Sequence, residues 1–312
     1  MIISCSRRTD IPAFYADWLF ARLRTGFVCV RNPRNPRQVR QIALTPDVVD
    51  GIVFWSKNPA PMLNRLRELK DYAYYFQFTV TPYGRDIEPN VPDQPEVMRT
   101  FQRLSETIGP ERVVWRYDPV LINRTYTAQA HLRQFEGMAR MLAGFTRRVI
   151  ISFLDTDYRN VRRNARQLSA ETLDEQDKLA LAGRFAEIAS GCGMEMQACA
   201  EETDFSACGI TPARCVDAAL LEAQLGCRLR VRKDPNQRPA CGCARSVDIG
   251  MYNTCPNGCL YCYANYNAGE IRKNRQNHGP GSPFLIGKPG PEDKVTERAA
   301  HSCRIHQIQF DI

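Results

Sequence analysis

The hydrophobic pattern of the chain alternates between short apolar runs and longer amphipathic stretches. The apolar runs predict strands at residues 1–4, 51–55, 74–81, 112–116, 148–153 and 195–200, with weaker ones at 228–231 and 247–252. The amphipathic stretches predict helices near residues 12–24, 59–70, 94–107, 126–145, 170–190 and 212–225. Strands therefore alternate with helices along most of the chain, which is typical of a parallel sheet with helical crossovers.

The predicted strands are hydrophobic along most of their length, as in VVW (113–115) and VIISF (149–153). Strands of this kind are buried on both faces, which indicates a parallel sheet. About eight strands and six helices in 312 residues predict an α/β fold of the (β/α) TIM-type barrel, with an open doubly wound sheet as the alternative. We expect a single barrel domain over residues 1–278 and a Gly/Pro-rich C-terminal arm over residues 279–312 that packs on the barrel.

Polar side chains follow six of the predicted strands. They include the segments SRRTD (6–10), SKN (56–58) and RYDP (116–119), the stretch from Thr79 to Tyr83, and the acids Asp155 and Glu201. In a (β/α) barrel the carboxyl ends of the strands converge on one face, where active sites are built. This face is therefore expected to carry the functional site.

Composition and charge narrow the class of protein without identifying a partner. Hydrophobic residues make up 44% of the chain and charged residues 24%, which is typical of a globular protein. No apolar run approaches the ~20 residues of a membrane span, and the N terminus carries no signal-peptide pattern. These features predict a soluble, cytoplasmic protein without membrane contact. The net charge of +8 is compatible with an anionic partner.

The segment RNPRNPR (31–37) repeats arginine at every third position, with prolines between the arginines. In polyproline II geometry this period places the arginines along one side of the chain. We expect either a solvated loop or a strip that contacts a phosphate-bearing or acidic partner.

Cysteine is the most informative residue type. Ten of the thirteen cysteines lie from residue 192 to residue 262, and in a reducing compartment such clustering indicates metal or iron–sulfur binding. The sharpest motif is CPNGCLYC, in which Cys255, Cys259 and Cys262 have the spacing C-x3-C-x2-C. Three thiolates at this spacing can hold three irons of a [4Fe–4S] cluster and leave the fourth iron open. Zinc is the competing interpretation, although structural zinc prefers four ligands in paired C-x2-C units.

The cysteine loop resembles the signature of the radical S-adenosylmethionine (SAM) superfamily, in which an aromatic residue precedes the third cysteine, as Tyr261 does here. The run CLYCYAN (259–265) is similar to the corresponding segment of spore photoproduct lyase-like members. The resemblance implies that the fourth iron binds SAM. It also implies that an electron from a donor such as flavodoxin or ferredoxin releases a 5′-deoxyadenosyl radical, which abstracts hydrogen from a substrate.

Radical SAM enzymes of this kind carry the motif on the first strand, whereas here it follows the last one, so the resemblance implies a circularly permuted barrel. The segments SRRTD, FWSK, FT and RYDP occur in the order that this permutation requires. The side chains that the resemblance assigns to SAM are Lys57, Thr79 and Thr9 or Asp10 at its methionine part, Tyr261 and Tyr263 beside the cluster, and Arg116 at a carboxylate or ribose. The permutation requires the loop of residues 255–262 to lie beside residues 6–10 and Lys57.

The whole chain also resembles an uncharacterised bacterial family, the domain of unknown function 1848. The resemblance is carried by the patterns SRRTDIP, FWSKNP, WRYDP, QRxxCxC and DIGxYxxCxxGCxYCYAN. Four further cysteines, in a cysteine-rich region at 192–265, fall in family-like stretches: Cys199, Cys215, Cys241 and Cys243. They could form a second iron–sulfur cluster or a zinc site, or they could be small buried apolar residues, and their spacing does not choose among these.

Two other classes of function stay open beside a radical SAM-type enzyme of unidentified substrate. A nucleic-acid-binding protein with a structural iron–sulfur or zinc site would use the positive charge and the aromatic residues near the cysteine loop, such as Tyr252 and Tyr266. A metal-dependent hydrolase on the same barrel is disfavoured, because the chain has only four histidines and no H-x-x-x-H pair.

Overall fold

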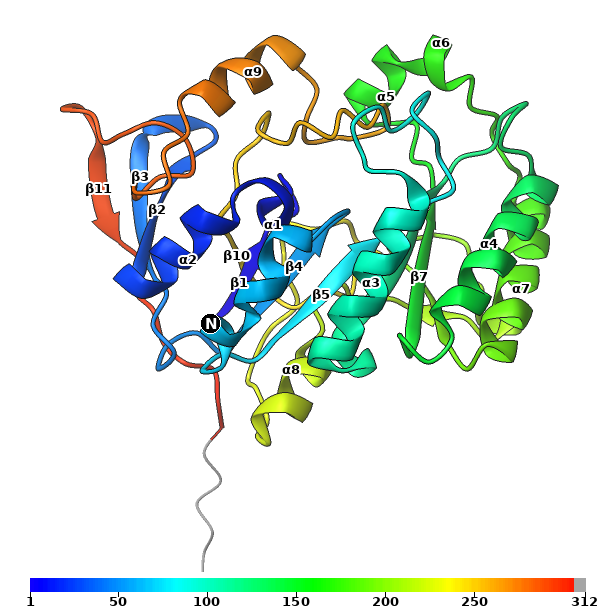
Figure 1. Cartoon of the computed structure of the whole chain (residues 1–312), viewed down its shortest axis with the longest axis horizontal. Coiled ribbons are helices and arrows are strands. Elements are labelled where there is room, and N and C mark those ends of the chain that lie inside the picture. Colours follow the sequence, from blue (N-terminus) through cyan, green and yellow to red (C-terminus); the bar gives the residue numbers. More distant parts are fainter. Residues whose placement is uncertain (306–312) are drawn as a thin grey trace, which may run out of the picture.

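The structure, a computed structural model, describes residues 1–305 of the chain (Figure 1). Its main element is an eight-stranded sheet in which neighbouring strands are parallel. The strands follow the order β10 (Val247–Asp248), β1 (Ile2–Cys5), β4 (Gly51–Ser56), β5 (Tyr74–Thr79), β6 (Val113–Val120), β7 (Arg148–Phe153), β8 (Glu195–Ala198) and β9 (Thr211–Pro212). The late strand β10 thus lies beside the first strand of the chain.

The two faces of this sheet have different neighbours, because side chains alternate between the faces along each strand. On one face Phe54, Phe76 and Trp115 pack against the helices in the larger hydrophobic core. On the other face Tyr75 and Val114 pack against the cysteine-rich part of the chain in a second core. Because both faces are covered, the strands are hydrophobic along most of their length, as the sequence predicts.

Long helices between the strands cover the face of the larger core, and Figure 1 shows α3, α4 and α7 in succession beside the sheet. Phe101, Phe135 and Phe185 supply fully buried rings from these three helices. The helices of this layer are α1 (Ile11–Phe14), α2 (Ala16–Thr25), the 3-10 helix η1 (Ala60–Leu69), α3 (Gln94–Ile108), α4 (Ala128–Leu142) and α7 (Glu175–Gly191). The remaining short elements are η2 (Pro110–Arg112), α5 (Arg159–Arg163), α6 (Ala165–Leu168), η3 (Ser206–Cys208), α8 (Ala218–Leu225) and α9 (Ala268–Gln276).

The opposite face of the sheet is covered by α8 and by an irregular segment of residues 226–246. Leu221 of α8 is fully buried in the second core, together with Cys215, Cys241 and Cys243. A TIM-type barrel fills the corresponding space with side chains from its own strands. Here a cysteine-rich stretch of chain occupies part of that space, which brings its thiols to the sheet.

A separate three-stranded sheet consists of β2 (Phe27–Asn32), β3 (Asn35–Ala43) and β11 (Lys294–Glu297). The expectation of a polyproline-type strip at residues 31–37 is wrong, because the chain turns there from β2 into β3. Residues 33–37 at this turn are exposed, as the alternative of a solvated loop predicts. Apolar residues are buried on both faces of the hairpin, with Val28 and Ile42 in the larger core and Cys29 and Val39 against Phe284, and this burial outweighs the prolines. Arg31 pairs with Asp293, so it is not free to bind a partner.

The Gly/Pro-rich segment that starts at residue 279 lies against this hairpin. The backbone N–H of Cys29 donates to the carbonyl oxygen of Pro283 at 2.9 Å, and β11 pairs in parallel with β3. Figure 1 shows the segment, coloured orange to red, beside β2 and β3. Residues 306–312 of the predicted arm lie outside the described residues.

The predicted α/β class with a parallel sheet is confirmed, as are seven of the eight predicted strands. Barrel closure is not found, because in the described part of the chain the edge strands β10 and β9 do not pair with each other. The predicted strand at residues 228–231 is wrong, since that segment forms only an isolated bridge between Leu229 and Arg304. No helix within residues 1–305 has the length and apolar character to cross a membrane.

Candidate metal centre

The cysteine motif lies in the loop that joins β10 to α9 at the carboxyl edge of the main sheet. Because β10 pairs with β1, this loop begins next to the segment that follows β1. The two segments and the end of β4 line one cleft, whose walls include Ser6, Thr9, Asp10, Ser56, Lys57, Thr79, Cys255, Cys259, Tyr261 and Cys262. The structure thus makes neighbours of the segments that the permutation hypothesis requires to be neighbours.

Asn265 fixes the cysteine loop to the segment after β1. Its amide oxygen accepts hydrogen bonds from the backbone N–H groups of Thr254 and Cys255, both at 2.9 Å. Its amide nitrogen donates to the carbonyl oxygen of Arg8 at 3.1 Å and lies 3.6 Å from Sγ of Cys262. One side chain therefore holds both ends of the motif and the neighbouring segment.

Three asparagines outside the loop fix its other side. Asn90, Asn160 and Asn164 donate to loop carbonyl oxygens at 2.8, 2.6 and 2.6 Å. Gly258 has a φ of +72°, and a Cβ atom there would lie 3.1 Å from Pro89, so glycine suits this position. The loop is therefore held in one conformation by the surrounding chain.

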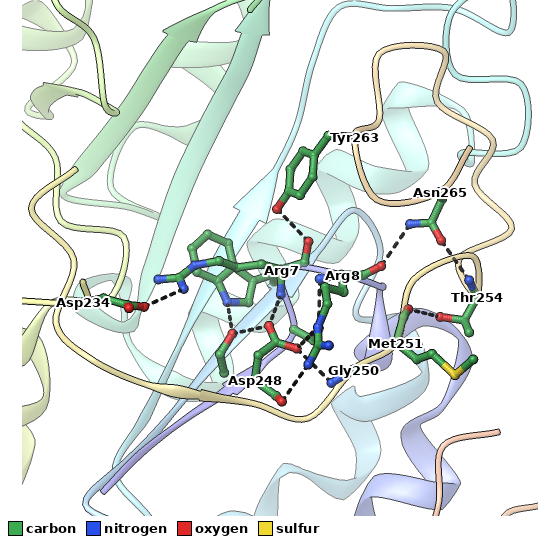
Figure 2. A network of polar contacts seen from close by, with 12 residues as sticks. Arg7, Arg8, Asp234, Asp248, Gly250, Met251, Thr254, Tyr263 and Asn265 are labelled. Atoms are coloured by element: carbon green, nitrogen blue, oxygen red, sulfur yellow. Dashed lines mark hydrogen bonds and ion pairs between the residues drawn. The ribbon is translucent and has the colours of Figure 1, made fainter. Parts of the chain in front are cut away.

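Asp248, the last residue of β10, joins that strand to the segment after β1 (Figure 2). Its carboxylate accepts hydrogen bonds from Ser6 Oγ at 2.7 Å, from the backbone N–H of Arg7 at 2.8 Å and from Nε of Arg8 at 2.9 Å. A Cβ atom at Gly250 would lie 2.1 Å from Ser6 Oγ, so the close approach of the two segments needs glycine there.

The ammonium group of Lys57 is buried in the wall of the cleft. It pairs with the Glu88 carboxylate, with 2.8 Å between Nζ and Oε1, and lies 5.8 Å from the centre of the Tyr261 ring. The hydroxyl groups of Thr81 and Tyr261 donate to the same oxygen of Glu88. Burial opposes the charge of Lys57, but the charge and hydrogen bond of Glu88 outweigh burial and raise the pKa of Lys57. The ammonium also donates to Oγ1 of Thr81 at 3.5 Å. Because an ammonium has three N–H donors, Lys57 keeps one for a carboxylate in the cleft.

Asp10 and Thr9 lie in the same wall but are engaged differently. The Asp10 carboxylate accepts hydrogen bonds from Ser56 Oγ at 2.7 Å and from the backbone N–H groups of Lys57 and Ala13, at 2.8 and 3.0 Å. Burial raises the pKa of Asp10 to about 6, although these hydrogen bonds oppose the shift. Thr9 Oγ1 is buried and has no hydrogen-bond partner among the described residues. Asp10 therefore positions the chain, whereas the Thr9 hydroxyl is available to a ligand.

The motif thiols lie in a setting that suits a metal. Cys255 and Cys259 are buried and Cys262 is partly exposed. Burial raises the pKa values of Cys255 and Cys259, so both are neutral thiols until a cation binds and releases their protons. Three cysteines beside the cationic Lys57 form a donor set that fits an iron–sulfur cluster with one open iron.

Within residues 1–305, no three His, Cys, Asp or Glu side chains are gathered as ligands of a single metal ion. A cluster does not need such a common point, because each thiolate binds a different iron.

Arg116 and Tyr263 are not among the described residues that line the cleft. The Tyr263 hydroxyl donates to the carbonyl oxygen of Arg7 at 2.8 Å, as Figure 2 shows. Arg116 pairs with Asp118, and its Nη1 donates to Sγ of Cys215 at 2.8 Å. Arg116 lies outside the cleft because side chains alternate between the two faces of a strand, and Arg116 shares a face of β6 with Val114 of the second core. The structure thus places Arg116 at the other cysteine group.

That other group consists of Cys199, Cys215, Cys241 and Cys243, which meet on the second face of the sheet. The Sγ atoms of Cys199 and Cys215 are 3.2 Å apart. Cys215, Cys241 and Cys243 are buried in the second core, and Cys199 packs against it. The hydrogen bond with Cys215 is the main cause that lowers the pKa of Cys199 to about 7 and also lowers the pKa of Cys243. The fold therefore gathers four cysteines that the sequence spacing alone cannot bring together.

Glu88, Asp248 and Asn265 shape the site but were not among the residues predicted from the sequence. Asp248 and Asn265 stand at the two ends of the pattern DIGxYxxCxxGCxYCYAN, and that position is a signal that could have found them. Glu88 lies outside the predicted motifs and meets Lys57 only through the fold, 31 residues further along the chain.

The fold and the site define an α/β protein whose parallel sheet carries a three-cysteine loop and a buried lysine at one edge. The family model described as Domain of unknown function (DUF1848) matches residues 2–264, and the chain belongs to this family. The matched region includes every strand of the main sheet and the cysteine loop. No curated protein matches the chain. The function therefore has to be argued from the site itself.

Proposed function

We propose that the chain is a radical SAM-type iron–sulfur enzyme on a circularly permuted (β/α) barrel that stays open between β9 and β10, with a substrate still to be identified. The observation that carries the proposal is the cleft in which the three-cysteine loop meets residues 6–10 and Lys57. When bound, a [4Fe–4S] cluster and SAM would supply a 5′-deoxyadenosyl radical after transfer of one electron from a donor such as flavodoxin or ferredoxin.

The strand order supports the permuted barrel. If counting begins at β10, the successive neighbours are β1, β4, β5, β6, β7, β8 and β9, so the cysteine loop follows the first strand of this series. The hairpin of β2 and β3 belongs to the other sheet and does not interrupt it. A permuted chain, in which the first strand of the series stands near the C terminus, can keep such a site if that strand still lies beside the strand that now begins the chain. Here β10 pairs directly with β1.

The side chains of the cleft would divide the binding of cluster and SAM among them. Cys255, Cys259 and Cys262 would ligate three irons. The buried ammonium of Lys57 would bind the carboxylate of SAM, because Glu88 and Thr81 leave one of its three donors free. The hydroxyls of Thr9 and Thr79 would contact the methionine part, and Thr9 has an unpartnered Oγ1 among the described residues.

Tyr261 would shield the ligand from water. Its ring lies near the Lys57 ammonium, and its hydroxyl donates to Glu88. It also lies 5.9 Å, between ring centres, from the buried Tyr83. Radical chemistry requires such an enclosed wall, because solvent and loose side chains quench reactive intermediates.

Cleavage of SAM tests the proposal. Protein purified and reconstituted without oxygen, reduced with dithionite and incubated with SAM, is expected to form 5′-deoxyadenosine and methionine in equal amounts. Each event takes up one electron from the reductant, and the adenosyl carbon gains one hydrogen atom from substrate or medium. Reduced protein that holds its full iron content and forms neither product would contradict the proposal.

A nucleic-acid-binding protein with a structural iron–sulfur or zinc site is the second candidate. Three exposed tyrosines near the loop favour it, since Tyr252, Tyr263 and Tyr266 expose 37%, 43% and 43% of their surface. The Arg8 guanidinium lies 5.5 Å from the centre of the Tyr252 ring. Exposed aromatic rings beside arginine can stack on bases. Tight binding of single-stranded nucleic acid without SAM cleavage would favour this candidate.

A further inference from the structure

The contact between Cys199 and Cys215 lies outside the SAM cleft and plays no part in the function proposed above. The two Sγ atoms are 3.2 Å apart, and both residues are free cysteines. Cys199 directly follows β8, and Cys215 comes shortly after β9, the strand that pairs with β8. The sulfur atoms of a disulfide are about 2.05 Å apart, so the two thiols need to approach by only about 1 Å to form a bond.

The two thiols differ in access and in charge. Cys199 is partly exposed, whereas Cys215 is buried and accepts a hydrogen bond at 2.8 Å from Nη1 of Arg116, which also pairs with Asp118. The hydrogen bond between the two thiols is the main cause that lowers the pKa of Cys199 to about 7 and raises the pKa of Cys215. At neutral pH the accessible thiol is therefore a thiolate in part of the molecules, and the thiol behind it keeps its proton. Redox-active dithiols combine such an accessible thiolate with a neighbouring second cysteine.

The backbone beside Cys199 has an uncommon conformation. Ala200, the next residue, has a φ of +54°, in the left-handed region that residues other than glycine rarely adopt. Such residues concentrate at functional sites, where the surrounding structure holds them. On the other side of the pair, β9 forms the edge of the main sheet with only two residues. A bond between Cys199 and Cys215 would fasten this short edge strand to the end of β8.

From these observations we propose that Cys199 and Cys215 are a redox-active dithiol that exchanges with low-molecular-weight disulfides, with Cys199 as the attacking thiol and Cys215 as the resolving thiol. Sγ of Cys199 attacks one sulfur of the small disulfide, forms a mixed disulfide and releases the other half as a thiolate. Cys215 then loses its proton, attacks Sγ of Cys199 and releases the second half. The protein pair loses two electrons and two protons, and the small disulfide takes them up as two thiols. Arg116 stabilises the negative charge that forms on Cys215.

Redox titration of the full-length protein tests this site without reference to SAM. The protein is equilibrated without oxygen in buffers of reduced and oxidised glutathione, alkylated with iodoacetamide and mapped by mass spectrometry. The wild type is expected to form an intramolecular disulfide between Cys199 and Cys215 as the share of oxidised glutathione rises, and dithiothreitol should restore both thiols. This measurement needs no variant, so it does not depend on whether a substitution affects folding.

Two variants separate the roles of the two thiols. Cys215→Ser should stop at a mixed disulfide between Cys199 and glutathione, whereas Cys199→Ser should lose both products, because Cys215 is buried. Cys227→Ser changes a partly exposed cysteine outside the pair and should form the disulfide as the wild type does. A Cys199 that stays a thiol in oxidised glutathione, a mixed disulfide that the wild type does not resolve, or a disulfide of Cys215 with another cysteine would overturn the proposal.

Discussion

Replacing Cys259 by alanine is expected to remove about four irons per chain and to abolish the formation of 5′-deoxyadenosine from SAM. Cys259 is the middle ligand of the motif and lies buried in the cleft beside Lys57. Two remaining thiolates cannot hold a cluster that needs three. Iron and sulfide analysis after anaerobic reconstitution, followed by chromatography of the SAM products, measures both effects.

Cys192→Ala is the matched control for this change. Cys192 is partly exposed at the C-terminal end of α7, outside both cysteine groups, so its variant should keep the iron and the product. Circular dichroism checks the fold of Cys259→Ala. Its spectrum should match that of the wild type, because the removal of one sulfur atom leaves the core of the sheet unchanged. If Cys259→Ala keeps its iron and still cleaves SAM, the loop does not hold the cluster that acts on SAM.

Replacing Lys57 by methionine is expected to lower the free energy of unfolding by about 3–5 kcal/mol. The change keeps an unbranched side chain that is one atom shorter, but it leaves the buried Glu88 carboxylate without its cation. The hydroxyls of Thr81 and Tyr261 would still donate to Glu88, yet they carry no charge to offset its burial. Urea denaturation of variant and wild type, under the same conditions, measures the difference.

Two further variants separate the ion pair from other effects. Lys70→Met removes an exposed lysine at the end of η1 and should change stability by less than about 0.5 kcal/mol. Lys57→Met/Glu88→Gln removes both charges and should be more stable than Lys57→Met alone. A Lys57→Met variant as stable as the Lys70→Met variant would show that the pair is solvated and that Lys57 has no buried role.

The strands and the position of the cysteine loop could be predicted because both depend on local pattern. Continuous apolar runs such as VIISF mark strands buried on two faces, and the order of polar strand ends predicts which segments share an edge. The hairpin of β2 and β3 was missed because the prolines between its arginines suggested an extended loop. The apolar run FVCV (27–30), followed by the apolar Val39 and Ile42, is the signal that should have carried more weight.

The parts of the site that escaped prediction depend on contacts between distant segments. Glu88 meets Lys57, and Cys199 meets Cys215, only because the strands bring separate loops to one place. Arg116 is a different case, since the two-residue period of its strand places it on the face of Val114. That period is visible in the sequence, and it could have predicted that Arg116 does not belong to the SAM cleft.

Electron paramagnetic resonance of the reduced protein, recorded with and without SAM, tests most directly whether the loop of residues 255–262 binds a cluster with an open iron. The account predicts the signal of a reduced [4Fe–4S] cluster that changes when SAM is added, because SAM would bind the iron that no cysteine holds. The signal should be absent from Cys259→Ala. A cluster signal that does not change with SAM, or zinc in the loop in place of iron, would contradict the account and favour the nucleic-acid-binding alternative.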